Sequence, residues 1–269
     1  MGNDRGMRHP GGEGGPSVAD RVFLVLESCA ASDRPLSLAE LVQRTGMPKT
    51  TLHRVCWKLV QHEMLEHDDE GFRVGTKMFA LGSTNPRLRR LRSISMPYLQ
   101  ALVARSGWVV NLAILSNRRA LIVEEVFGDQ MPSVRRMGGA TMPLHATAIG
   151  KALLSGLEAD ALDDLVGTSA LRPFTRRTIV RPNLLRDHLA RIRRTGIAFS
   201  HEEWSMGTSG VAAPVIAGGR VVAAVALVGV PDETTMRHLA HPVRVAADGV
   251  GRALDPAGGP VAALVGSVA

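Results

Sequence analysis

The sequence predicts an α+β protein built from two domains. Its 269 residues exceed the size of one small domain, and a hydrophobic content of 45 % is enough for two cores. Between residues 17 and 75 the pattern gives three short amphipathic helices followed by a hairpin. From residue 108 onward strands and helices alternate, which is typical of helices packed on an antiparallel sheet.

Local signals define the first two helices. Apolar residues at helical spacing predict a helix from Val18 to Cys29. Ser37 and Glu40 form a capping box, in which each side chain bonds the other residue's backbone amide, and this predicts the start of a second helix. Gly46 predicts its end, because glycine accepts the left-handed conformation that often follows a helix.

A third helix and a hairpin complete this domain. Pro48 stands where the first turn of a helix favours proline. Two short helices joined by a tight, glycine-containing turn make a helix-turn-helix. Apolar runs then flank residues 68–71, which predicts a hairpin with Gly71 at a positive φ. We therefore assign residues 17–78 to a winged helix-turn-helix.

The polar face of the third helix indicates double-stranded DNA as a partner. A helix fits the major groove, and its first two turns meet the base edges. Arg54 has the forked geometry that reads guanine, and Ser37 and Arg73 are placed for phosphates. The alternative is that these side chains only form solvated faces. The DNA-contacting candidates are Ser37, Lys49, Thr50, Thr51, His53, Arg54 and Arg73.

Bulk charge adds little to this interpretation. The chain has 32 Lys and Arg against 25 Asp and Glu, a net charge of +7. Residues 17–90 hold eleven basic and nine acidic side chains, so their net charge is only +2. The placement of the charges, rather than their sum, supports DNA as the partner.

At this point the sequence resembles the IclR family of bacterial regulators. The resemblance implies a transcriptional repressor or activator that is not an enzyme and that works as a homodimer or a dimer of dimers. A dimer with two recognition helices predicts a palindromic operator. The matching segments are Pro35-Leu36-Ser37-Leu38-Ala39-Glu40-Leu41-Val42, Thr45-Gly46-Met47-Pro48-Lys49-Thr50-Thr51-Leu52-His53-Arg54 and Gly71-Phe72-Arg73-Val74-Gly75.

The rest of the chain divides into a connector and a second domain. We expect a linker over 79–93, an effector-binding domain over 94–255, a disordered arm over 1–16 and a flexible tail over 256–269. A basic run in the linker is either a solvated helix face, a phosphate contact or an inter-domain latch; it comprises Arg87, Arg89, Arg90 and Arg92. The resemblance implies that the second domain has a GAF/PAS-like α/β fold.

Periodicity gives the elements of this second domain. The expected strands are 109–115, 120–126, 211–216 and 221–230, and Gly218 and Gly219 close the last hairpin. The expected helices are 94–106, 148–154, 158–165, 184–192 and 238–253.

A loop that runs into a helix, over residues 143–152, suggests a ligand site. Free amides at a helix start can hold an anion. The resemblance implies that this motif lines an effector pocket and that the amides of Ala148 and Ile149 hold a carboxylate. The alternative is that Leu144 and Ile149 are simply core residues.

The resemblance also implies how the effector differs from those of some relatives. Family members that sense small keto acids place polar residues where this chain has Ser200, Gly210, Ala226 and Val228. We therefore expect an organic acid or apolar metabolite less polar than glyoxylate or pyruvate, with Trp108 and Trp204 either lining the pocket or in the core. The effector-binding candidates are Leu144, Ala148, Ile149, Ser200, Gly210, Ala226 and Val228.

Other chemistry has weak support. The acids in His201-Glu202-Glu203 lack the further ligands that a metal needs, and residues 207–210 are not a nucleophile elbow. No phosphate-binding or dinucleotide motif occurs, so we expect no metal, cofactor or catalytic residue. An enzyme with a winged-helix appendage, or a winged helix that binds protein, remains the alternative.

The cysteines and the hydropathy indicate the cellular compartment. Cys29 and Cys56 lie in apolar helical patterns and are expected to be buried thiols rather than a disulfide. There is no run of 18 apolar residues, and the glycine-rich first 16 residues do not resemble a signal peptide. We therefore expect a cytoplasmic protein without a membrane partner.

Overall fold

A computed structural model describes residues 17–130, 138–167, 170–229 and 232–255. The expected arm over 1–16 and tail over 256–269 lie outside the described residues. The chain divides into two compact units, Met1–Asn85 and Pro86–Ala269, and each is described by itself.

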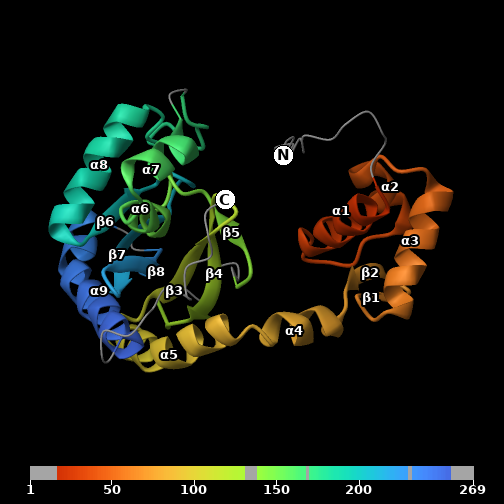
Figure 1. Cartoon of the computed structure of the whole chain (residues 1–269), viewed down its shortest axis with the longest axis horizontal. Helices are drawn as coiled ribbons and strands as arrows, with labels where there is room; N and C mark the ends of the chain where they lie inside the picture. Colours follow the sequence, from red (N-terminus) through yellow and green to blue (C-terminus); the bar gives the residue numbers. More distant parts are fainter. Residues whose placement is uncertain (1–16, 131–137, 168–169, 230–231, 256–269) are drawn as a thin grey trace. The chain divides into compact units, whose positions relative to one another are not determined.

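The first unit is a winged helix-turn-helix, as the sequence predicts (Figure 1). Three helices precede a two-stranded antiparallel hairpin, and a further short helix follows it. The bounds are α1 Val18–Ala30, α2 Leu38–Thr45, α3 Lys49–Gln61, β1 Leu65–Asp68, β2 Gly71–Val74 and α4 Thr76–Ser83.

The predicted cap and stop of α2 are both present. The hydroxyl of Ser37 accepts from the Glu40 amide, and the Glu40 carboxylate accepts from the Ser37 amide. Gly46 ends the helix in the left-handed conformation, with φ of 69°. A second capping box at Ser17 starts α1, and Pro48 is the N-cap of α3 rather than part of its first turn.

The wing is tied to the start of α2 by the backbone. Leu36 and Phe72 form an isolated antiparallel bridge with reciprocal hydrogen bonds of 2.8 Å. Gly71 has a φ of 131°, and a Cβ there would lie 2.5 Å from the Leu36 carbonyl oxygen. Glycine is therefore needed for both the turn and the close approach. Leu36 and Phe72 belong to the core of this unit, together with Val25, Cys29, Leu41, Leu52, Cys56 and Leu59.

The second unit is built on one antiparallel sheet of six strands, with the order β5-β4-β3-β8-β7-β6. Both predicted hairpins are confirmed, and Gly218 and Gly219 make the turn of the second with positive φ angles. The short strands β5 and β6 were not predicted. The bounds are β3 Val109–Ser116, β4 Arg119–Val126, β5 Thr141–Met142, β6 Ala198–His201, β7 Ser209–Ala217 and β8 Arg220–Val228.

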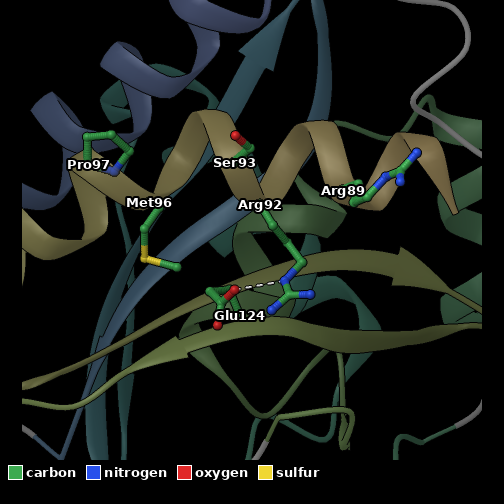
Figure 2. Close-up of a pocket in the computed structure, with 6 residues that line it drawn as sticks. All are labelled: Arg89, Arg92, Ser93, Met96, Pro97 and Glu124. Atoms are coloured by element: carbon green, nitrogen blue, oxygen red, sulfur yellow. Dashed lines mark hydrogen bonds and ion pairs between the residues drawn. The ribbon is translucent and has the colours of Figure 1, made fainter. Parts of the chain in front are cut away.

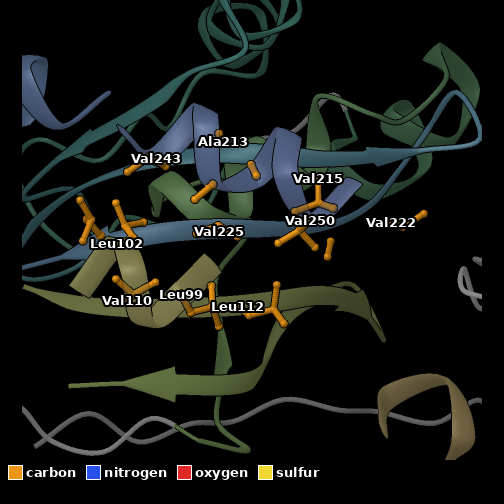
Figure 3. Packing of buried hydrophobic residues seen from close by; sticks show 14 of the residues in the cluster. Leu99, Leu102, Val110, Leu112, Ala213, Val215, Val222, Val225, Val243 and Val250 are labelled. Carbon is orange, nitrogen blue, oxygen red and sulfur yellow. The ribbon is translucent and has the colours of Figure 1, made fainter. Parts of the chain in front are cut away.

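Helices cover both faces of this sheet, which confirms the predicted α+β fold. Leucine and valine side chains of α5 and α9 pack on one face (Figure 3). The other face carries small residues such as Ala212, Ala224 and Ala226, and α6 packs there with α8 behind it. The bounds are α5 Pro86–Ser106, α6 Ala148–Leu154, α7 Ala159–Val166, α8 Pro182–Thr195 and α9 Glu233–Leu254.

Helices α5 and α9 begin several residues earlier than the periodicity predicts, and α8 begins two residues earlier. Helix α5 begins at Pro86, so the arginine run that we expected in a linker over 79–93 lies in its first turns. Residues 86–93 belong to the second unit, where Leu91 is buried against the sheet. Helix α9 begins at Glu233, because Asp232 caps it by accepting from the Thr235 amide at 2.8 Å.

Candidate functional site

The exposed side of α3 forms the first candidate site. Lys49, Thr50, His53 and Arg54 are exposed, and Thr51 is half-buried. The opposite side of α3 is held in the core by Leu52, Cys56 and Leu59. Lysine and arginine are the only charged residues in α3, which has no acidic residue. A helix with one buried stripe and a cationic outer face is suited to contact a polyanion.

Trp57 links this helix to the wing, and sequence reasoning missed it. Its indole N–H donates to Nε2 of His53 at 2.9 Å. Its ring lies 5.1 Å from that of His67 and 6.1 Å from that of Phe72, measured between centroids. Trp57 thus orients one predicted DNA-contacting side chain and packs α3 against the hairpin. Its position one turn after His53 was the available signal.

Two other predicted contacts are engaged within the unit. Arg73 forms ion pairs with the wing acids Glu66 and Asp68, which hold the pKa of Arg73 above its usual range. The Ser37 hydroxyl belongs to the cap of α2 and also donates to Glu40. Both residues are exposed, but their polar groups already have protein partners.

A cavity of about 340 Å³ in the second unit is the other candidate site. It lies between the small-residue face of the sheet and the start of α6. Six of the seven predicted effector residues line it, and Leu144 is instead buried in the core cluster beside Ile149. Trp204 lines the cavity, whereas Trp108 packs against the core on the other face. The six are Ala148, Ile149, Ser200, Gly210, Ala226 and Val228.

Thr147 caps the N-terminus of α6. Its hydroxyl accepts from the Gly150 amide at 3.1 Å and donates to the Pro143 carbonyl at 2.7 Å. The amides of Ala148 and Ile149 come before the first intrahelical hydrogen bond, so they have no acceptor within the helix. Both residues line the cavity.

A buried ion pair connects α6 with the loop after β6. Nζ of Lys151 donates to Oε1 of Glu203 at 2.6 Å, and the side chains are 0 % and 7 % exposed. Burial holds the pKa of Lys151 below its usual range, although the Glu203 charge opposes the shift. Glu202, the residue before Glu203, pairs with Arg177 instead. The acids of the His201-Glu202-Glu203 cluster therefore have separate partners.

Part of the arginine run lies along a shallow groove of about 490 Å³ on α5, which Arg89 and Arg92 help to line (Figure 2). Arg92 reaches from α5 to β4, where its Nε donates to Glu124 at 2.7 Å. Arg90 donates to the carbonyl of Leu254, at the end of α9. These two arginines hold the second unit together.

The described residues include neither a cluster of metal ligands nor a membrane-spanning helix. In the ranges that the structure describes, no three His, Cys, Asp or Glu residues are grouped as a metal site would need. Within the same ranges, no helix has the length and apolarity to cross a bilayer.

Two family models match the two units in order. Residues 18–69 match the IclR helix-turn-helix domain, and residues 87–252 match the C-terminal domain of the bacterial transcriptional regulator IclR. The acetate operon repressor of Salmonella typhimurium is 34 % identical over 196 residues, which cover 71 % of this chain and 72 % of the repressor. The transcriptional repressor IclR of Escherichia coli is 32 % identical over 197 residues, or 72 % of each chain.

Solved structures agree with the fold. An IclR homologue from Microbacterium hydrocarbonoxydans, complexed with 4-hydroxybenzoate, superposes with a TM-score of 0.79 at 24 % identity and covers 88 % of this chain and 99 % of its own. The Thermotoga maritima IclR gives a TM-score of 0.69 at 25 % identity and covers 88 % of this chain and 98 % of its own. With both units matched in order and this degree of identity to the repressors, the chain belongs to the IclR family of bacterial transcriptional regulators.

Proposed function

We propose that this regulator binds a palindromic operator through the outer face of α3 and that a small molecule in the cavity of the second unit controls it. The family is one of transcriptional regulators rather than enzymes. The single observation that carries the DNA-binding proposal is the outer face of α3, where Lys49 and Arg54 stand exposed on a helix without acidic residues. In the major groove, Arg54 reads a base while Lys49 contacts phosphate.

The cavity supports the proposed effector chemistry. Its volume of about 340 Å³ lies within the usual range for small-molecule pockets, about 300–1,000 Å³. Gly210, Ala226 and Val228 place no hydrogen-bonding side chain on its wall. A very small polar acid would lose its water there without gaining enough partners. An organic acid with an apolar body, or an apolar metabolite, fits better than glyoxylate or pyruvate, with its acid group at the amides of Ala148 and Ile149.

A homodimer, alone or as a dimer of dimers, is the assembly that we propose. Phe23 is 60 % exposed, Phe79 76 % and Leu81 50 %, all in the first unit. Helix α4, which carries Phe79 and Leu81, has no buried residue. Large apolar side chains left on a surface are typical of an interface. In a symmetric dimer, two copies of α3 reach half-sites about 34–36 Å apart.

The DNA-binding proposal is tested with the full-length protein and genomic DNA fragments selected by it. Lys49→Ala and Arg54→Ala should weaken binding, and loss of a phosphate contact should lower the salt slope by about 1. Arg176→Ala is the matched control, because it removes an exposed positive charge from the other unit. Unchanged affinity and slope in both α3 variants would show that α3 is not the recognition helix.

The assembly is tested by light scattering of the wild type and Phe79→Glu. The wild type should have at least twice the mass of one chain, and the variant should dissociate and lose operator affinity. A monomeric wild type that still protects a palindromic site would contradict the proposed dimer.

A further inference from the structure

The wall of the cavity includes a polar side chain, Asn111, whose oxygen has no hydrogen-bond partner among the described residues. Asn111 lies on β3, lines the cavity and is 5 % exposed. Its chain neighbours Val110 and Leu112 point to the opposite face of the sheet, into the core with α5 and α9. Among the residues that the structure describes, Oδ1 of Asn111 has no hydrogen-bond partner. A buried carbonyl of this kind is costly unless a donor reaches it.

The neighbouring strand places a carboxyl side chain beside this amide. Glu125 on β4 is the direct cross-strand partner of Asn111, and it lines the same cavity. Two polar side chains from adjacent strands therefore share one wall of the cavity.

Two other polar side chains around the cavity, Thr147 and Ser200, are already used within the fold. The Thr147 hydroxyl is taken up by the cap of α6 and the Pro143 carbonyl. The Ser200 hydroxyl donates to the Ala146 carbonyl at 3.3 Å. Asn111 differs from both because it lines the cavity while its Oδ1 has no partner among the described residues.

We infer that Asn111 selects an effector that carries a hydroxyl or amino group on an otherwise apolar body, and that this group donates a hydrogen bond to Oδ1 of Asn111. The inference rests on the proposed effector role of the cavity. It adds the requirement that the effector carries a hydrogen-bond donor. An analogue without a donor would fill the same volume but leave Asn111 unpaired, so it would bind more weakly.

The experiment uses matched ligands on the full-length protein. The probes are benzoate, 4-hydroxybenzoate, 4-aminobenzoate and 4-methoxybenzoate, with phenylacetate and its 4-hydroxy derivative as a longer pair. Thermal shift and calorimetry should show that the hydroxy and amino members bind at least tenfold more tightly than the donor-free members. The methoxy compound keeps the oxygen as an acceptor but has no donor, so it should bind no more tightly than benzoate.

Two variants assign the preference to Asn111. Asn111→Leu removes the amide at similar volume, and it should reduce the ratio between donor-bearing and donor-free ligands to about twofold or less. Asn111→Asp keeps an acceptor, so it should retain a clear preference for the donor-bearing ligands. The ligand ratio in the wild type needs no variant, so the test holds even if Asn111→Leu folds poorly.

The outcomes separate the inference from the proposed function. If donor-free acids bind the wild type as tightly as their hydroxy partners, and Val228→Trp abolishes that binding by filling the cavity, the effector site stands and the inference is overturned. Retention of the full preference in Asn111→Leu also overturns it. If none of the probes binds while operator binding is intact, the proposed effector chemistry and the inference fall together.

Discussion

Lys151 and Glu203 form a buried ion pair that joins two walls of the cavity in the second unit. Nζ of Lys151 lies 2.6 Å from Oε1 of Glu203, and the two side chains are 0 % and 7 % exposed. Lys151 follows the cavity-lining Ile149 by two residues on α6, and Glu203 directly precedes the cavity-lining Trp204. The hydroxyl of Thr178 donates to the Glu203 carbonyl at 2.6 Å and holds the same loop. The pair therefore fixes the wall of α6 against the loop after β6.

Lys151→Met should destabilise the second unit strongly. Removing one partner of a buried pair leaves the other charge without compensation, at a cost of about 3–5 kcal/mol. The double variant Lys151→Met/Glu203→Met should recover much of this loss, because no buried charge remains. Chemical unfolding followed by fluorescence measures both.

The matched control for the buried pair is Arg237→Met. It breaks the exposed pair with Glu233 on α9 and should cost far less stability, because solvent screens both charges. A denaturation midpoint of Lys151→Met equal to that of Arg237→Met would contradict the assigned role of the buried pair.

Both cysteine thiols should be unreactive in the native protein. Burial raises the pKa of Cys29 from 9.0 to about 11 and that of Cys56 to about 12. The thiolate is the reactive form, so at pH 8 its population at Cys29 falls by roughly a hundredfold.

A chromogenic disulfide reagent should titrate no thiol in the folded protein and two after unfolding. Ala30→Cys supplies an exposed thiol on the same helix and should add one rapid equivalent. Rapid reaction of the wild type would contradict the assigned burial.

The short-range signals in the sequence were sufficient for the first unit. The Ser37–Glu40 box, Gly46 and Gly71 each act within a few residues, and the structure has all three as predicted. The early start of α5 was missed because its first turns lack apolar periodicity, and tertiary packing of Leu91 stabilises them. Strands β5 and β6, of two and four residues, are too short to show a period.

The site was predicted less completely, for a related reason. Six of the seven residues that alignment to the resembled family identified do line the cavity, but most of its lining residues were not identified. Asn111 and Glu125 share a wall only through the β3–β4 register, and Lys151 and Glu203 are 52 residues apart. The two partners of such a pair show no common pattern in the sequence, because they are far apart along the chain and meet only when it folds.

The cap of α2 should make the first unit sensitive to acid. The Arg34 side chain, and then the amide and hydroxyl of Ser37, lower the pKa of Glu40 from 4.5 to about 2. A carboxylate with a lowered folded pKa contributes stability above the unfolded value, and this contribution is lost as the pH falls from about 4.5 toward 2. Glu40→Gln should therefore unfold more easily than the wild type at pH 7, and the difference should shrink toward pH 2.

Thermal unfolding across this pH range measures the effect of the cap. Glu27→Gln removes an exposed carboxylate from α1 and serves as the control, with a much smaller difference at pH 7. A constant difference between Glu40→Gln and the wild type from pH 7 to pH 2 would show that the ionised carboxylate does not stabilise the cap.

Trp57 should influence operator binding without contacting DNA itself. Trp57→Ala removes the ring between α3 and the wing and frees the His53 imidazole, so we expect operator affinity to fall about tenfold, or about 1.4 kcal/mol. Trp57→Phe keeps an aromatic ring but lacks the indole N–H. It should unfold close to the wild type yet lose part of the affinity, because His53 is no longer held. Met206→Ala, which trims an exposed side chain of the other unit, should change neither. Binding titrations and chemical unfolding of the same preparations separate the two roles, and wild-type affinity in Trp57→Ala would exclude both.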